Sequence, residues 1–521
     1  MMGLTGFAVN QVNIISPIII LTLCVCNCIH ITASYRLFLS EGQEKNLAIK
    51  SSLDVNLFPI FLTTLTTAIG FLSMNFSDSP PFRELGNFTV VGVVAAFILS
   101  VTFYPALLTC RQIKTIPNSN GLATFFDKLV NSISTNTNLY LVVCFVSSAF
   151  LMSFIFDNEL NDDAVKYFDK SLEFRKAVDF TQERLTGIDR ISYSLDSGEE
   201  QGINDPAFLI KIEKFADWYK SQPEVVHVSS YIDVIKRLNQ NMNNGEAEYY
   251  RLPTSKELAS QYLLLYEMSL PFGLDLNNQI NIDKSSLLLT VRVKDQKRQQ
   301  LIDLDQRAQN WLNDNASSMS TVGASFSMMF AYIGQRNIHG MITGSLLALL
   351  LVTVTLVFAL RSIKYGLLSL IPNAFPAAIA FGIWGIFVSE VNLVVSVIFA
   401  ITLGVVVDDT VHFTTKYLKG MRKNNNNPVE SVRYAFSNVG KALISTTIAL
   451  SLGFFVLATS DFAVNSYMGA MVGMTIVLAL IWDFLFLPAL LMKVDSRAFS
   501  TELEKKASGA NIAVQEAELI S

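Results

Sequence analysis

The apolar run that begins at Leu393 ends in Gly404-Val-Val-Val-Asp-Asp-Thr-Val-His-Phe413. This run has the length of about 20 residues that an α-helix needs to cross a bilayer. An acidic side chain at mid-bilayer costs roughly 2.5–3.5 kcal/mol on insertion scales, so carboxyl groups inside a span are functional candidates. The segment therefore predicts a membrane helix that carries a functional pair, Asp408 and Asp409, toward one end.

Eight further segments qualify as membrane spans by length and apolar composition. The whole chain of 521 residues is 51% hydrophobic and only 16% charged, which predicts a polytopic α-helical membrane protein. Its 39 basic and 44 acidic residues exclude a generally basic nucleic-acid binder. We expect no secretory signal peptide, because the first residues lack a basic region and a small-residue cleavage site, and residues 1–10 resemble the last turns of an additional, partial span. The other expected spans are Val12–Ala33, Leu57–Asn75, Leu85–Cys110, Leu139–Phe156, Ile342–Leu360, Tyr365–Val388, Ala442–Thr459 and Ser466–Met492.

The distribution of basic residues predicts the orientation of the spans. With Asn10 placed outside, the cytoplasmic loops and the C-terminal tail hold eighteen Lys and Arg residues, whereas the short outer loops hold only Arg83. This bias satisfies the positive-inside rule, and the reverse orientation violates it. We therefore expect residues 157–340 outside, the C-terminus in the cytoplasm, and no Lys or Arg inside any span.

These expectations divide the chain into six parts. The outer part has mixed α/β character: it shows strand composition at 191–195 and 287–294, and helix signals at 206–220, 229–238, 254–268 and 297–313. Asp205-Pro206 is expected to cap and begin the first of these helices, and 239–246 to be a loop. The parts are 1–110 (a partial span and three spans that end a first repeat), 111–138 (a cytoplasmic linker), 139–156 (one span), 157–340 (the extracytoplasmic α/β domain), 341–493 (a second repeat of five spans) and 494–521 (a cytoplasmic tail).

An internal repeat links the two sets of spans. Thr63-Thr-Leu-Thr-Thr-Ala-Ile-Gly-Phe71 matches Thr446-Thr-Ile-Ala-Leu-Ser-Leu-Gly-Phe454 at an offset of 383 residues. The same offset pairs Leu85-Gly86 with Met468-Gly469 and Pro105–Leu108 with Pro488–Leu491, and an offset of 382 pairs His30 with His412. Parallel repeats that meet near the bilayer midplane are a common plan of transporters.

A set of polar residues in the second repeat is expected to form a proton relay. Carboxyl groups in a low dielectric can take up and release protons, and hydroxyl and imidazole groups can extend the path. Helix spacing places His412 one turn from Asp408 on the same face, and similar depths bring Asp483 and the two threonines into the same layer. The expected relay residues are Asp408, Asp409, His412, Thr446, Thr447 and Asp483.

The corresponding positions of the first repeat look degenerate. Asn27 and His30 take the places of Asp409 and His412, and Asn27 cannot titrate, whereas Thr63 and Thr64 are retained. The cysteines at 24, 26 and 28 are interpreted as packing residues rather than a metal or redox site.

The quoted Gly404–Phe413 motif, the Thr-Thr…Gly-Phe span and the closing Leu-Pro-Ala-Leu-Leu resemble the resistance-nodulation-division (RND) superfamily. The branch resembled is that of the predicted exporters of the mycobacterial membrane protein large (MMPL) type, with a more distant likeness to sterol-sensing proteins. The resemblance implies twelve spans, two porter-like outer domains and location in the bacterial inner membrane. It also implies export of lipids or other hydrophobic molecules driven by proton influx, usually by oligomers.

Relative to this plan, the chain is expected to lack the N-terminal part. We therefore expect it to assemble either with a separate N-terminal portion or with further copies of itself as a homo-oligomer. A first alternative is therefore a truncated, non-transporting lipid-sensing or scaffold remnant. The family also usually has an aspartate where Asn27 stands, which supports this alternative.

Enzymatic alternatives are disfavoured, and no cofactor is expected. An intramembrane aspartyl protease needs two carboxyl groups on facing helices, whereas Asp408 and Asp409 are adjacent and point about 100° apart. A metal hydrolase built on Asp408 and His412 would lack a third ligand. The phosphate-binding Gly-rich Lys motif that ATP-driven transport would need is absent from the sequence.

Overall fold

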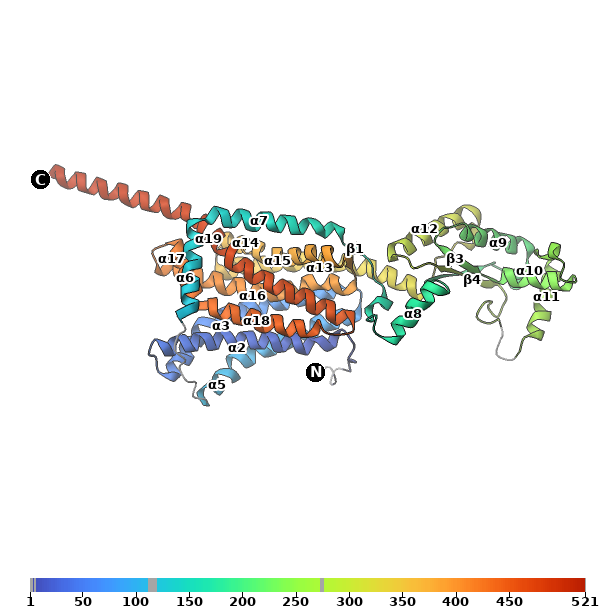
Figure 1. Ribbon diagram of the computed structural model, residues 1–521, viewed down its shortest axis with the longest axis horizontal. Coiled ribbons are helices and arrows are strands. Elements are labelled where there is room, and N and C mark those ends of the chain that lie inside the picture. The colour runs from blue at the N-terminus through green and yellow to red at the C-terminus, as the bar shows by residue number, and fades with distance from the viewer. Residues whose placement is uncertain (1–2, 4–5, 111–119, 272–275, 521) are drawn as a thin grey trace. The chain divides into compact units, whose positions relative to one another are not determined.

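A computed structural model describes residues 3, 6–110, 120–271 and 276–520; for residue 120 and residues 497–520 it describes the backbone alone. The chain forms two compact units (Figure 1). The first combines Met1–Glu159 with Arg336–Ser521, and the second is Leu160–Gln335.

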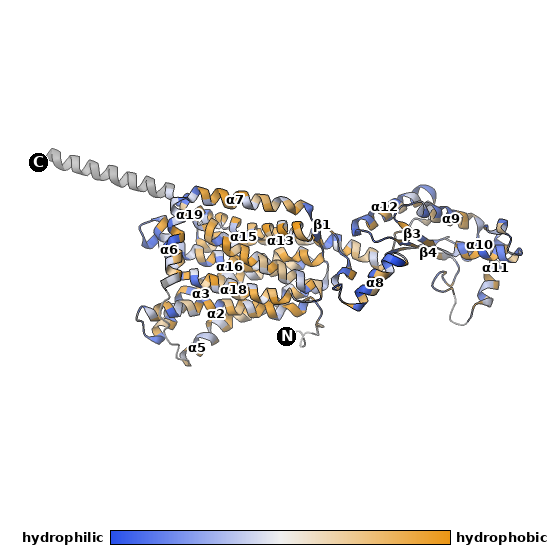
Figure 2. Cartoon of the chain, in the orientation of Figure 1, coloured by the Kyte–Doolittle hydropathy of each residue, from blue (hydrophilic) through white to orange (hydrophobic). Residues whose placement is uncertain are grey.

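The first unit is a bundle of long apolar helices that lie side by side (Figures 1 and 2). Nine helical stretches of the described residues are long and apolar enough to cross a membrane, which confirms the expected polytopic fold. They are Asn13–Ser40, Lys45–Phe76, Pro80–Cys110, Thr137–Asp157, Phe326–Leu360, Ile363–Phe387, Leu393–Lys423, Pro428–Leu457 and Ala463–Ser496.

The helices of these stretches follow the chain in order. They are α2 (Ser16–Ser40), α3 (Lys45–Leu72), α4 (Pro80–Val101), α5 (Phe103–Cys110), α7 (Thr137–Ser153), α13 (Phe326–Leu360), α14 (Ile363–Leu368), α15 (Leu370–Phe387), α16 (Leu393–Lys423), α17 (Pro428–Ala435), α18 (Lys441–Leu457) and α19 (Ala463–Ile520). Two short strands, β1 (Glu159–Leu160) and β5 (Glu390–Val391), are also present.

The repeat seen in the sequence reappears as matching helix contacts. Helix α3 packs on both α4 and α16, and its counterpart α18 packs on both α19 and α2. At matching positions, a Cβ on Gly86 would meet the carbonyl oxygen of Phe71, and a Cβ on Gly469 would meet that of Phe454. The glycines therefore permit the same close approach in both copies, which confirms the internal repeat.

Helix α16 is the most deeply buried of these helices and contacts α3, α15, α17 and α19. It runs past the expected end at Phe413 and stops at Lys423, where Asn425 and Asn426 adopt positive φ values and Asn427 caps α17. This extension buries the side chain of Lys416, which is only 4% exposed. Lys416 thus lies on the same helix as Asp408 but beyond the end of the expected span, and the absence of Lys and Arg from the spans stays a prediction.

Two other segments differ from their expected form. Residues 111–119 of the expected linker lie outside the described part, but α6 (Asn120–Thr135) follows, with Phe126, Val130 and Ile133 buried against the membrane unit. The amphipathic spacing of its apolar residues is the sequence signal for this helix within the expected linker. Helix α19 continues through the expected tail, to Ile520. The partial span at residues 1–10 falls partly outside the described residues, and residues 6–12 form turns and coil.

The second unit packs helices on a three-stranded antiparallel sheet with the order β2-β4-β3. Strands β2 (Arg190–Asp196) and β4 (Ser286–Val293) match the expected strands, and Asp205 caps α9 by accepting a hydrogen bond from the Ala207 amide. Strand β3 (Val225–Ser229) and helix α8 (Glu173–Arg184) were not predicted. The remaining helices are α9 (Pro206–Lys220), α10 (Tyr231–Met242), α11 (Lys256–Ser269) and α12 (Arg298–Asn315), so the first residues of the expected 239–246 loop are helical.

Candidate functional site

The candidate site is centred on the adjacent carboxylates of α16. Asp408 and Asp409 are each 7% exposed. Successive helical residues point about 100° apart, so the two side chains face different neighbouring helices. Each carboxyl group consequently has its own set of partners.

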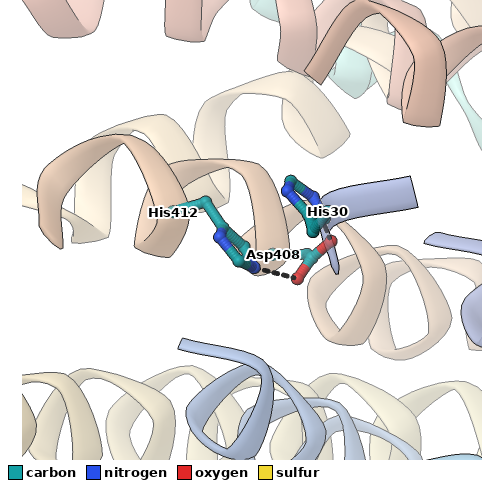
Figure 3. Close-up of side chains that lie close together, drawn as sticks. All are labelled: His30, Asp408 and His412. Atoms are coloured by element: carbon teal, nitrogen blue, oxygen red, sulfur yellow. Dashed lines mark ion pairs between the residues drawn. The ribbon is translucent and has the colours of Figure 1, made fainter. Parts of the chain in front are cut away.

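Asp408 lies beside two histidines from different repeats (Figure 3). The Nε2 atom of His412, one turn further along α16, is 3.7 Å from one Asp408 oxygen, and Nε2 of His30 on α2 is 3.8 Å from the other. The two imidazole rings stack with their centroids 3.8 Å apart and their planes 4° apart. His30 and His412 are 1% and 0% exposed, so the cluster is closed to bulk water except at the carboxylate.

Several polar atoms of this cluster are unsatisfied. His30 Nε2, both ring nitrogens of His412 and Asp408 Oδ1 are buried and have no hydrogen-bond partner among the described residues. Distances of 3.7–3.8 Å are too long for direct hydrogen bonds. Buried polar atoms without partners are uncommon, and each such group calls for an explanation such as a water molecule or an ion.

Asp409 faces α18 and is paired with two hydroxyl groups. The Thr446 hydroxyl donates to one Asp409 oxygen at 3.5 Å, and the Thr447 hydroxyl donates to the other at 3.4 Å. The Thr446 hydroxyl also lies within hydrogen-bonding distance of the Ala442 and Leu443 carbonyl groups of its own helix. The structure thus brings together the three residues that the sequence placed in one layer.

Asp483 on α19 is fully buried and forms a third polar contact. Its carboxylate accepts a hydrogen bond from the Thr410 hydroxyl, at 3.1 Å to one oxygen and 3.4 Å to the other. Thr410 was not among the expected site residues. Its position directly after two aspartates in an apolar helix was the available signal, because a buried hydroxyl needs a partner.

The first-repeat residues behave unequally. The ring of His30, the expected degenerate counterpart of His412, contacts both His412 and Asp408, so this first-repeat residue is part of the cluster around Asp408. The Thr63 side chain also approaches Asp408, whereas the Thr64 hydroxyl bonds to the Ile60 carbonyl of its own helix. Asn27 is buried, and no hydrogen bond between it and the three aspartates occurs in the described part of the chain.

Two consequences concern the alternatives to transport. The expectation that Asp408 and His412 lack a third metal-binding neighbour is wrong, because His30 supplies one from the other repeat. Among the described residues no hydrogen bond joins any two of Asp408, Asp409 and Asp483, so the shared-proton pair of an aspartyl protease is not formed there.

A model of the MMPL family matches residues 4–118 and 294–511, which include all of these site residues. The chain belongs to the MMPL family. The residues between the two matched stretches comprise most of the second unit, so membership rests mainly on the membrane helices. A search of curated proteins returned no match to this MMPL chain.

Two solved structures share the fold of this MMPL protein. A crystal structure of SecDF in its super-membrane-facing form aligns with a TM-score of 0.52 and 13% identity. A crystal structure of SecDF from Thermus thermophilus, described as a translocon-associated membrane protein, aligns with a TM-score of 0.54 and 12% identity. Both alignments cover 95% of this chain but only 56% of the SecDF chain. At this identity the likeness establishes the RND-type fold alone.

Proposed function

We propose that this MMPL protein is a secondary active membrane transporter in which the movement of a hydrophobic or lipid-like substrate is coupled to protons that occupy Asp408 and Asp409. The observation that carries the proposal is the burial of three carboxyl groups within one membrane bundle, where two helices of the second repeat meet helices of the first. Intramembrane acidic residues with polar partners commonly mark proton relays.

The arrangement supports a stepwise path for the proton. Asp408 lies between the repeats beside His30 and His412, and Asp409 lies on the α18 side with two threonine hydroxyls. A change in protonation at Asp408 alters the charge next to both histidines and therefore the electrostatic contact between the repeats. A ligand or proton shifts a two-state equilibrium only by its differential affinity for the two states. Protonation that favours one packing of the repeats would provide that difference.

The distribution of Lys and Arg supports an orientation in a bacterial inner membrane that places the second unit on the extracytoplasmic side and the C-terminus on the cytoplasmic side. The family resemblance supports a lipid-like substrate. Because the chain spans 56% of the SecDF chains that it matches, transport by this chain, alone or with a partner, belongs to the proposal.

The test uses the full chain reconstituted in liposomes with an entrapped pH indicator and a fluorescent phospholipid as the probe. An imposed proton gradient is expected to drive both probe movement and proton flux. Asp409→Asn removes the titratable group with almost no change in shape, and we expect it to abolish both signals while the protein still inserts and remains monodisperse.

Asp461→Asn is the matched control, because Asp461 is exposed in the connection between α18 and α19. This variant should transport like the unmodified chain. The proton-coupled proposal would be overturned if gradient-dependent movement of the phospholipid probe persists in Asp409→Asn. It would also be overturned if probe movement in the unmodified chain is independent of the proton gradient.

A further inference from the structure

The histidine–aspartate cluster between the repeats offers three metal-ligating atoms. One ring nitrogen of His30, one of His412 and one oxygen of Asp408 all lie within 4.8 Å of one another. Two of the ligands come from α16 and the third comes from α2, so the cluster joins the two repeats (Figure 3). The unsatisfied ring nitrogens and carboxylate oxygen described above belong to this cluster.

The spacing of these atoms is close to that of a zinc site. A tetrahedral Zn²⁺ ion with bonds of about 2.0–2.1 Å places its ligand atoms roughly 3.3–3.4 Å apart. The observed separations between His Nε2 atoms and Asp408 oxygens are 3.7 and 3.8 Å. These two distances run to different Asp408 oxygens, and one ligand atom from each of the three residues lies within 4.8 Å of the others, so the side chains must draw closer by up to about 1.5 Å to bind one ion. The parallel stacking of the rings must also relax, because their lone pairs converge on one ion only when one ring tilts.

We propose that His30, Asp408 and His412 bind a divalent transition-metal ion, with Zn²⁺ as the best fit. Two imidazoles and one carboxylate suit Zn²⁺, whereas Ca²⁺ and Mg²⁺ take oxygen ligands. Three protein ligands leave the fourth position of a tetrahedral ion open for water. The Asp408 side chain is 9% exposed, which gives an entering ion access to its first ligand.

The surrounding charges set limits on the affinity. Lys416, two turns beyond Asp408 on α16, is close enough to interact electrostatically with both histidines and opposes a bound cation. Metal-bound histidines usually donate their second nitrogen to an acceptor, and His412 Nδ1 has none among the described residues. The site should therefore bind metal less tightly than a fully supported zinc centre.

A bound ion would act on the transport cycle. It would occupy Asp408 in place of a proton and tie α2 to α16, so it should hold the repeats in one arrangement. This consequence rests on the proposed function, whereas metal binding itself does not.

The experiment measures metal binding by the full chain in detergent, without any transport assay. Co²⁺ serves as the spectroscopic probe, because a four-coordinate site gives intense visible d–d bands, and Zn²⁺ is added in competition. We expect one Co²⁺ ion per chain, displaced by Zn²⁺. His30→Gln and His412→Gln should each weaken binding more than about 10-fold, whereas His227→Gln, at an exposed position on β3, should leave it unchanged.

Lys416→Gln provides a variant that is expected to gain rather than lose affinity. Removal of a nearby positive charge should tighten Co²⁺ binding several-fold, and a gain of this kind cannot come from misfolding. The site is refuted by binding that survives both His30→Gln and His412→Gln, by loss in His227→Gln, or by an unchanged Lys416→Gln. Because none of these readouts involves protons or lipid, the proposed function could fail while the metal site holds, and the reverse.

Discussion

The imidazole rings of His30 and His412 stack almost parallel, with centroids 3.8 Å apart, although 382 residues separate them in the chain. They occupy matching positions of the two repeats, so the stacked pair lies where the two copies meet. Asp408 contacts both rings. A change of charge at this single carboxylate therefore changes the electrostatic interaction with one histidine of each repeat.

The stacked pair should be energetically coupled. In a double-mutant cycle of His30→Ala and His412→Ala, the cost of the double variant should fall short of the sum by about 0.5–1.5 kcal/mol, the usual worth of an aromatic pair beyond its buried area. Unfolding of the full chain in mixed detergent micelles measures each free energy. Strict additivity would show that the rings do not depend on each other.

Gly70→Ala should loosen the contact between the repeats. A Cβ at this position would lie 2.9 Å from Gly404 Cα and 3.2 Å from the Ala400 carbonyl oxygen, and both atoms belong to the backbone of α16. Overpacking of this kind typically costs about 1–3 kcal/mol. The backbone of α16 cannot move without disturbing the Thr67 hydroxyl, which donates to the Gly404 carbonyl at 2.5 Å.

The melting temperature of the purified chain in detergent reports this loss. Gly121→Ala on α6 is the matched control, because nothing lies within 4 Å of its added Cβ. Alanine is the better helix former, so this control should be neutral or slightly stabilising. Equal melting temperatures for the two variants would contradict the close packing of α3 on α16.

Arg298→Met should destabilise the second unit strongly. The Arg298 guanidinium pairs with Asp189 at 2.7 Å and with Asp163 at 3.0 Å, and all three side chains are less than one tenth exposed. Removal of one partner from a buried ionic cluster typically costs about 3–5 kcal/mol, because the other charges stay buried without compensation.

Hydrogen exchange of the β2 and β4 amides in the full chain measures this effect, and exchange should accelerate by two orders of magnitude or more. Arg307→Met is the control: Arg307 pairs with Glu224 at 2.7 Å but is 44% exposed, so about 0–1 kcal/mol is expected. A similar response of the two variants would show that the Arg298 cluster adds little to stability.

The second unit should lose stability in alkali. The Tyr193 hydroxyl donates to Asp305 at 2.6 Å and lies 2.6 Å from the Tyr219 hydroxyl. Burial raises the pKa of Tyr193 and of Tyr219, and the neighbouring Asp305 carboxylate raises both further. The unfolded tyrosines titrate near pH 10, so the stabilisation is fully present below about pH 10 and is lost as the pH rises above it.

Tyr193→Phe removes one of these groups and leaves Asp305 without one donor. We expect a loss of about 1–3 kcal/mol at neutral pH and a shallower decline above pH 10. Hydrogen exchange of the β2 amides at pH 8 and at higher values reports both effects. Tyr250→Phe, at an exposed position, should change neither, and an unaltered alkaline slope in Tyr193→Phe would disprove the assignment.

Prediction from the sequence succeeded where the signal is local. Apolar runs of sufficient length located the nine candidate spans, and the Asp205-Pro206 pair located the start of α9. It failed where an element is amphipathic and short, as in α6, or where polar residues continue a helix beyond the apolar run, as in α16 from Phe413 to Lys423. Hydropathy reports transfer into lipid, whereas the extension of α16 is buried by protein and not by lipid.

The sequence by itself determined the membrane fold, the internal repeat and the presence of three carboxyl groups in the bundle, because span length, repeated motifs and composition need no knowledge of contacts. Only the tertiary structure decided the partners of each carboxyl group. It placed His30 against Asp408, Thr446 and Thr447 against Asp409, and Thr410 against Asp483. These contacts join residues tens to hundreds of positions apart, and they depend on helix rotation and close packing that no local pattern encodes.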